Sequence, residues 1–192
     1  MDSLQVYTVG HSTRPIDEFL GLLHEHAVAS VVDVRRFPGS RRHPQFSQEA
    51  LRATLTSSGV GYLHKVELGG RRSLLGGSPN TAWRNASFRA YADHMDSAGF
   101  QAALSELIEL ASQQRTAIMC AEVLPHRCHR RLIADALVAR GAEVIHSISP
   151  GRSEHHVLNP QAHLLEDGRL RYIAPVQGDL ELFPSDRVSI LS

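Results

Sequence analysis

The densest group of reactive side chains in this sequence lies between residues 120 and 131. Cys120 and Glu122 come first, and Cys128 and His129 follow after a proline, with Arg130 directly behind them. The apolar residues that come next recur at helical spacing, so Cys128 is expected at or just before a helix N-terminus. A helix dipole and nearby cations lower the pKa of a thiol there. The segment therefore favours either a nucleophilic Cys128 or an anion site at the helix start.

The same segment leaves two other interpretations open. Metal-binding atoms are carried by Cys120, His126, Cys128 and His129, but their spacing matches no common zinc pattern, so no metal is assigned. The two cysteines also fit a structural turn with buried thiols. No other cofactor is expected.

Polar residues also follow three of the predicted strands. His11 and Ser12 follow the first strand, Asp33 and Arg35 follow the second, and Glu122 follows a later one. Because ligand sites of open α/β sheets form beyond the carboxyl ends of the strands, we expect these side chains to share a site. A simple ion pair between Asp33 and Arg35 is the alternative. The candidate catalytic residues are Asp33, Glu122, Cys128 and His129.

The stretch 35–46, RRFPGSRRHPQF, is basic and has an aromatic residue near each end. Its arginines would contact phosphates while Phe37 or Phe46 stacks on a base. The alternative is a solvated loop whose phenylalanines are buried in the core. A second basic segment, 67–72, adds two arginines beside two glycines. The candidate substrate-binding residues are His11, Ser12, Arg35, Arg36, Arg41, Arg42, Arg71, Arg72 and Arg130.

Strands and helices alternate along the chain, which is typical of a parallel sheet with helices on both faces. The pattern predicts an α/β fold with a mostly parallel sheet of about five strands. Strands are expected at 4–9, 28–34, 60–66, 116–120 and 142–147, and helices from 15, from 47, and at 87–95, 100–113 and 128–140. Residues 67–87 are interpreted as a functional insertion. The expected domain is 1–150, with 151–192 as an irregular C-terminal extension.

Composition excludes several classes of protein. The 192 residues carry no net charge, which argues against a whole-protein electrostatic grip on nucleic acid. Hydrophobic residues make up 42%, an ordinary share for a globular domain, and none of the apolar runs is long enough for a membrane helix. The two cysteines do not form a secreted disulfide framework, and the N-terminus lacks the pattern of a secretory signal. We therefore expect a cytoplasmic protein without a membrane partner.

Several stretches, in order, resemble the family named domain of unknown function (DUF) 488. They are TVGHST at 8–13, VDVRRFPGSR at 32–41, ELGGRR at 67–72, WRNASFR at 83–89, CAE at 120–122 and CHRR at 128–131. The resemblance implies an α/β domain of the flavodoxin- or Rossmann-like type. It implies no reaction, because the family has no established activity to transfer.

A different pattern lies near the C-terminus. Residues 177–183, QGDLELF, resemble the short motif by which bacterial repair and replication proteins bind the sliding clamp. Leu182 and Phe183 would fill an apolar pocket of the clamp, and Gln177 would form hydrogen bonds at its edge. The candidate partner-binding residues are Gln177, Leu180, Leu182 and Phe183. The alternative is a C-terminal strand or helix that packs these apolar residues into the core.

These observations predict an enzyme that acts on DNA, in repair or base removal, with Asp33 and Glu122 as a carboxylate pair like that of glycoside hydrolases. DNA and the replicative sliding clamp are the expected partners. One alternative is a small-molecule enzyme on a nucleotide-like or anionic substrate, with Cys128 as nucleophile. Another is a non-catalytic module that binds nucleic acid or metal.

Overall fold

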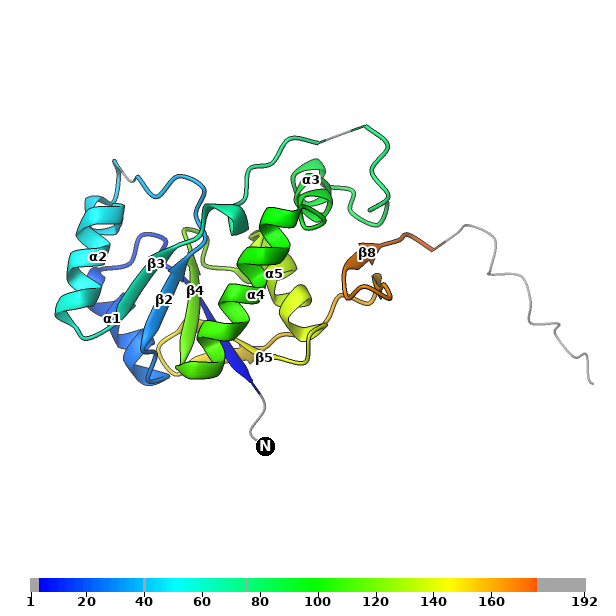
Figure 1. Cartoon of the computed structure of the whole chain (residues 1–192). Helices are drawn as coiled ribbons and strands as arrows, with labels where there is room; N and C mark the ends of the chain where they lie inside the picture. The colour runs from blue at the N-terminus through cyan, green and yellow to red at the C-terminus, as the bar shows by residue number, and fades with distance from the viewer. Residues whose placement is uncertain (1–3, 40, 75, 176–192) are drawn as a thin grey trace, which may run out of the picture.

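The computed structural model describes residues 4–39, 41–74 and 76–175 (Figure 1). Its centre is a six-stranded sheet in the order β3-β2-β4-β1-β5-β6. Five strands are parallel: β1 (Gln5–Gly10), β2 (Ser30–Asp33), β3 (Gly61–His64), β4 (Thr116–Cys120) and β5 (Glu143–Ser149). The sixth, β6 (Arg152–His155), is antiparallel to β5. The predicted α/β class and the mostly parallel sheet are confirmed, and the sheet has one strand more than expected.

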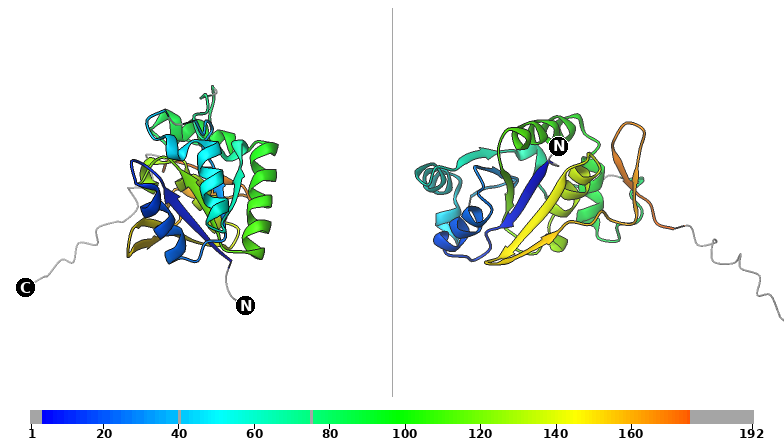
Figure 2. Two further views of the ribbon diagram at one scale, coloured as in Figure 1. Left: turned by 90° about the vertical axis from the view of Figure 1, so that its left-hand side faces the viewer. Right: turned by 90° about the horizontal axis from the view of Figure 1, so that it is seen from below.

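Helices cover both faces of the sheet, which can be seen in each of the views (Figures 1 and 2). On one face lie α1 (Ile16–Glu25) and α2 (Gln48–Ser57); on the other lie α4 (Ala98–Gln113) and α5 (Arg130–Val138). The short helix α3 (Ala86–His94) lies above the carboxyl ends of the strands. Two apolar clusters result, one on each side of the sheet. The central strands are apolar throughout because both of their faces are covered.

The order of the strands creates a crevice at the end of β4. The chain leaves β1 and β2 toward the helices of one face, α1 and α2, whereas it leaves β4 toward α5 on the other face. Since β4 lies between β1 and β2, connections to opposite faces begin at neighbouring strand ends. Such a switch in direction is where open α/β sheets bind their ligands. Cys120 is the last residue of β4 and therefore lies at this crevice.

Three single turns of 3-10 helix connect these elements: η1 (Pro44–Phe46), η2 (Val66–Leu68) and η3 (Pro125–Arg127). The last of them changes the expected geometry near the cysteines. Cys128 follows η3 in extended backbone, with φ −123° and ψ 147°, and α5 begins only at Arg130. The predicted helix over 128–140 thus starts two residues later than the sequence pattern suggested.

The chain beyond Pro150 is more regular than expected. It forms β6 and a two-stranded hairpin of β7 (Ala162–Leu164) and β8 (Leu170–Tyr172). The Tyr172 side chain is fully buried, and its hydroxyl donates to Asp135 Oδ2 of α5 at 2.9 Å. These strands have only three or four residues each, too few for a recognisable alternation of apolar and polar residues. Residues 177–183 lie outside the described residues.

Across the part of the chain that the structure describes, no helix has both the length and the apolar character needed to cross a membrane.

Candidate active site at the carboxyl end of β4

A pocket of about 580 Å³ opens where β2 and β4 end. The loop after β2, the Gly-Arg insertion, α3 and the start of α5 all contribute to its wall. Its lining residues are Arg35, Arg36, Phe37, Gly39, Gly70, Arg71, Asn85, Ser87, Phe88, Tyr91, Cys120, Ala121, Glu122, Arg127, Cys128 and His129. The volume is in the usual range for small-molecule sites. The structure therefore brings Arg35, Glu122, Cys128 and His129 to one cavity, as the sequence led us to expect.

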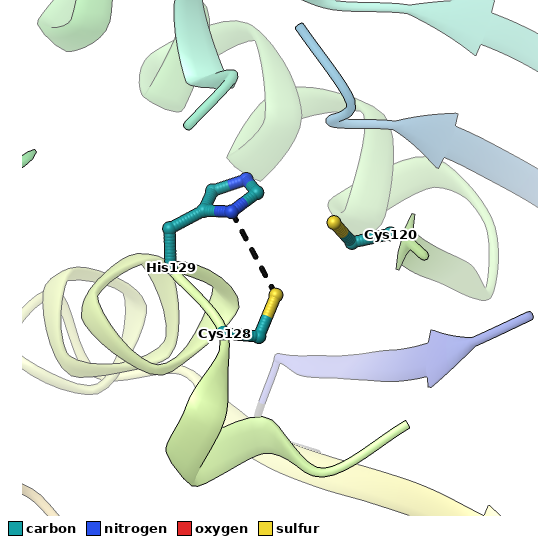
Figure 3. A group of neighbouring side chains, drawn as sticks. All are labelled: Cys120, Cys128 and His129. Atoms are coloured by element: carbon teal, nitrogen blue, oxygen red, sulfur yellow. Dashed lines mark hydrogen bonds between the residues drawn. The ribbon is translucent and has the colours of Figure 1, made fainter. Parts of the chain in front are cut away.

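Two thiols and one imidazole meet at the wall of this pocket (Figure 3). The donor atoms of Cys120, Cys128 and His129 all lie within 4.8 Å of one another, and Cys128 Sγ is 3.7 Å from His129 Nδ1. The other ring nitrogen, Nε2, donates to the carbonyl oxygen of Val34 at 3.0 Å. Because that bond fixes the ring, Nδ1 faces the sulfur atoms. The ring of Tyr91 packs against the imidazole, with 5.0 Å between the ring centres.

The environment distinguishes the two thiols. The neighbouring Cys120 thiol lowers the pKa of Cys128 well below its usual value, against the effect of burial, and His129 and the charge of Arg130 act in the same direction as Cys120. The neighbouring Cys128 and burial raise the pKa of Cys120. Cys128 is therefore the more acidic thiol of the pair.

Arg130 does not line the pocket but lies behind it, almost completely buried. Its guanidinium donates to the Thr8 hydroxyl at 3.2 Å and to the carbonyl oxygens of Glu122 and Val123. These contacts hold the loop after β4 against β1. The expected role of Arg130 in direct substrate binding is thus replaced by a role in positioning this loop and in supplying charge behind Cys128.

A buried chain of hydrogen bonds continues from Thr8. Its hydroxyl contacts His146 Nδ1 at 2.8 Å, His146 Nε2 lies 3.0 Å from His156 Nδ1, and His156 Nε2 lies 2.8 Å from Asp135 Oδ1. Burial, followed by the charges of His156 and Arg130, lowers the pKa of His146 to about 3. Sequence reasoning missed this chain because its members come from β1, α5, β5 and the segment after β6, with no shared local pattern.

Asp33 lies below the pocket rather than on its wall. The carboxylate is fully buried and accepts from Arg35 Nε at 2.9 Å and Nη2 at 2.6 Å, and from the Tyr62 hydroxyl at 2.8 Å. Arg35 also donates to the carbonyl oxygen of Phe46 at 2.7 Å. The alternative interpretation, an ion pair between the two residues, is what the structure contains. Most donors of Arg35 are therefore already in use, although its side chain reaches the pocket.

The other predicted substrate-binding residues divide into two groups. Arg36 and Arg71 line the pocket together with Arg127. Arg72 turns away and donates to carbonyl oxygens of its own segment. The remaining predicted residues, which do not line the pocket, are His11, Ser12, Arg41 and Arg42. His11 is buried with its ring stacked on Phe46. Arg41 and Arg42 are exposed.

The two phenylalanines of the basic loop also differ in whether they face the pocket. Phe46 is fully buried, as the core interpretation predicted, whereas Phe37 is 64% exposed at the pocket and carries the guanidinium of Arg36 5.5 Å from its ring centre.

Sequence reasoning also missed part of the wall. Asn85 is the N-cap of α3, Ser87, Phe88 and Tyr91 lie within that helix, and Gly70 comes from the insertion. A Cβ atom at Gly70 would lie 2.8 Å from His129 Nδ1, so this glycine allows the imidazole to approach the backbone. The resemblance did include WRNASFR at 83–89, and that stretch was the available signal.

Fold and site together define an α/β domain with a thiol-bearing pocket at the switch point of a parallel sheet. Residues 15–137 match the family described as "Domain of unknown function DUF488", and since the match spans more than half of the chain, the protein belongs to this family. The matched range begins just before α1, ends within α5 and includes every residue that lines the pocket. No match was found among curated proteins or among solved structures.

Proposed function

We propose that this protein is a hydrolytic enzyme that binds a nucleotide-like, anionic substrate in the pocket at the end of β4. The observation that carries the proposal is the composition of the pocket lining. The pocket combines the guanidinium groups of Arg36, Arg71 and Arg127 with the rings of Phe37 and Phe88. Guanidinium groups pair with phosphate or carboxylate oxygens in two-pronged geometry, and aromatic rings stack on bases.

The proposed reacting groups line the same pocket. Hydrolysis needs an activated nucleophile and a group that transfers protons. The Cys120, Cys128 and His129 cluster generates the nucleophile, and Glu122, whose side chain is exposed on the pocket wall, transfers the proton. The pairing of Asp33 with Arg35 and Tyr62 supports this assignment over a mechanism with two carboxylates.

The test is a substrate panel of nucleosides and nucleoside mono-, di- and triphosphates, with products separated by chromatography. We expect at least one phosphorylated member to raise the melting temperature and to be hydrolysed. Arg71→Ala should weaken binding and Glu122→Gln should abolish turnover while binding persists. Arg115→Ala, at the opposite end of β4, and Glu166→Gln, on the exposed β7–β8 hairpin, are the matched controls. If neither binding nor turnover is found with any anionic nucleotide, the proposal is wrong.

Exposed Phe37 favours a second candidate, an enzyme that acts on DNA by base removal or a related repair reaction. An exposed ring beside arginines is how single-stranded nucleic acid is commonly held, and enzymes that modify bases extrude them into a pocket. Oligonucleotides with a panel of damaged bases, followed by alkali, test for strand breaks at the damaged site. Arg41→Ala with Arg42→Ala should flatten the salt dependence of DNA binding. DNA binding that is unchanged by both substitutions would favour a free nucleotide as the substrate.

A further inference from the structure

Three soft donor atoms converge on one point of the pocket wall. Cys120 comes from the end of β4, and Cys128 and His129 come from the turn before α5; Figure 3 shows both sulfur atoms and the imidazole directed toward a common space. Thiolate and imidazole are the ligands that Zn²⁺ prefers among protein side chains. In the part of the chain that the structure describes, no other group of three histidine, cysteine or acidic residues converges in this way.

The distances fit a tetrahedral ion. With Zn–S bonds of about 2.3 Å and Zn–N bonds of about 2.0 Å, two ligand atoms on one tetrahedral ion lie roughly 3.5–3.8 Å apart. Cys128 Sγ and His129 Nδ1 are 3.7 Å apart, and all three donor atoms lie within 4.8 Å of one another. A small rotation of side chains is therefore enough to complete a three-ligand set.

The backbone explains how consecutive residues serve as ligands. Cys128 is extended, whereas His129 has helical angles, φ −59° and ψ −17°. The bend between them turns two adjacent side chains toward the same point, an arrangement that no spacing rule for zinc sites would reveal. This is why the sequence pattern led us to assign no metal.

His129 is oriented as a metal ligand requires. Its Nε2 hydrogen bonds to the backbone carbonyl of Val34 at 3.0 Å, which leaves the Nδ1 lone pair facing Cys128. Histidines that bind metals almost always donate their other ring nitrogen to a carbonyl or carboxylate in this way. The absent side chain of Gly70 leaves room for the ring at this position.

We propose that Cys120, Cys128 and His129 bind one thiophilic divalent cation, Zn²⁺ or a close analogue, whose fourth coordination position faces the pocket. Two thiolates and a neutral imidazole balance the two positive charges of the ion. Three protein ligands with an open fourth position are typical of catalytic rather than structural zinc. The catalytic role rests on the proposed function: a water at the open position would be the nucleophile, and Glu122, which lines the same pocket, would accept its proton.

Metal content and cobalt spectroscopy test the site without any substrate. The full-length protein, purified without chelator, should contain one equivalent of zinc by elemental mass spectrometry. After removal of the metal, Co²⁺ titration should produce the near-ultraviolet band of thiolate-to-cobalt charge transfer. Cys120→Ser and Cys128→Ser should each lower the intensity of that band and His129→Gln should weaken Co²⁺ binding, whereas His163→Ala, at an exposed histidine of β7, should leave both unchanged.

A glycine variant tests the geometry without altering a ligand. Gly70→Ala places a methyl group 2.8 Å from His129 Nδ1, so we expect Zn²⁺ affinity to fall by about tenfold or more. Gly76→Ala, in the same segment, meets no atom within 4 Å and is the matched control. If the cysteine variants fail to fold, alkylation of the wild-type thiols gives the answer instead, since bound Zn²⁺ should protect both from iodoacetamide.

Sub-stoichiometric metal, no charge-transfer band and thiols that react equally fast with and without Zn²⁺ would overturn the proposal and leave Cys128 as a direct nucleophile. The metal site and the proposed function can fail separately. A protein that binds one Zn²⁺ but hydrolyses no nucleotide retains the metal site and loses the function. A chelated, metal-free protein that hydrolyses nucleotides at the full rate retains the function and removes the catalytic role of the metal.

Discussion

The Asp33 carboxylate is the clearest case of a residue whose chemistry is decided by its neighbours. Arg35 and Tyr62 supply its hydrogen bonds, and the side chain has no exposed surface. Removing one partner of a buried ion pair leaves the other charge without compensation, which typically costs about 3–5 kcal/mol. We therefore expect Asp33→Asn to lower the free energy of unfolding by several kcal/mol in a urea titration.

Tyr62→Phe serves as the reference for that experiment, because it removes a single hydrogen bond to the carboxylate and should cost less, about 1.5–3 kcal/mol. Should Asp33→Asn keep its stability but lose hydrolysis, Asp33 would be a catalytic residue as first predicted, and the structural role assigned above would be wrong.

His146 makes a second prediction at the residue scale, about pH. Burial lowers its pKa from 6.5 to about 3, so the folded protein keeps this imidazole neutral while the unfolded chain binds a proton below about pH 6.5. The contribution of the neutral His146 to the stability is therefore fully present above pH 6.5 and is lost as the pH falls toward 3. Between pH 7 and pH 5, the titration of this one histidine should lower the free energy of unfolding by about 2 kcal/mol.

Melting temperatures measured across that interval test the prediction. His146→Gln should show a smaller decrease between pH 7 and pH 5 than the wild type, whatever its stability at pH 7. His163→Gln, at an exposed position on β7, should reproduce the wild-type slope. His11, whose pKa burial lowers to about 4, contributes in the same direction and should preserve part of the slope in the His146 variant.

At the scale of elements, the site depends on close contact between the end of β1 and the loop after β4. A Cβ atom at Gly10 would lie 2.0 Å from the carbonyl oxygen of Glu122, a backbone atom that cannot move alone. Gly10→Ala should therefore displace the loop, lower the melting temperature and weaken any ligand binding in the pocket. Gly21→Ala in α1, where a Cβ meets nothing within 4 Å, should be neutral or slightly stabilising.

The elements that the sequence predicted well are those whose pattern reflects burial directly. Residues 116–120 were expected as a strand and form β4, because all five side chains are buried between two layers of helices. The positions of Arg35, Glu122 and Cys128 at one edge followed from the parallel topology alone. The pairing of Asp33 with Tyr62 did not, since it depends on a neighbouring strand in the sheet. The convergence of Cys128 and His129 depends on one backbone bend that residue types do not encode.

At the scale of the whole molecule, the α/β domain continues beyond residue 150. Asp135 in the middle of α5 receives hydrogen bonds from His156, Asn159 and Tyr172, all from this later part of the chain. Leu170 and Tyr172 belong to the same apolar cluster as the inner faces of α4 and α5. The segment from β6 through β8 therefore contributes to the core of the domain.

The last prediction concerns the clamp-like segment, 177–183. We expect it to bind the replicative sliding clamp, with Leu182 and Phe183 as the apolar anchors that supply most of the binding free energy. Changing both to Ala, or ending the chain at residue 175, should abolish binding in a calorimetric titration that gives a dissociation constant of roughly micromolar for the full chain. Side chains that serve as clamp anchors contribute nothing to the core of the free protein, so both variants should melt at nearly the wild-type temperature. A chain ending at residue 150 is the comparison variant. It lacks Tyr172 and the other partners of Asp135, so it should be destabilised by several kcal/mol. A large loss of stability on changing Leu182 and Phe183 would instead mean that these side chains pack into the core, and the case for DNA as a partner would lose its main support.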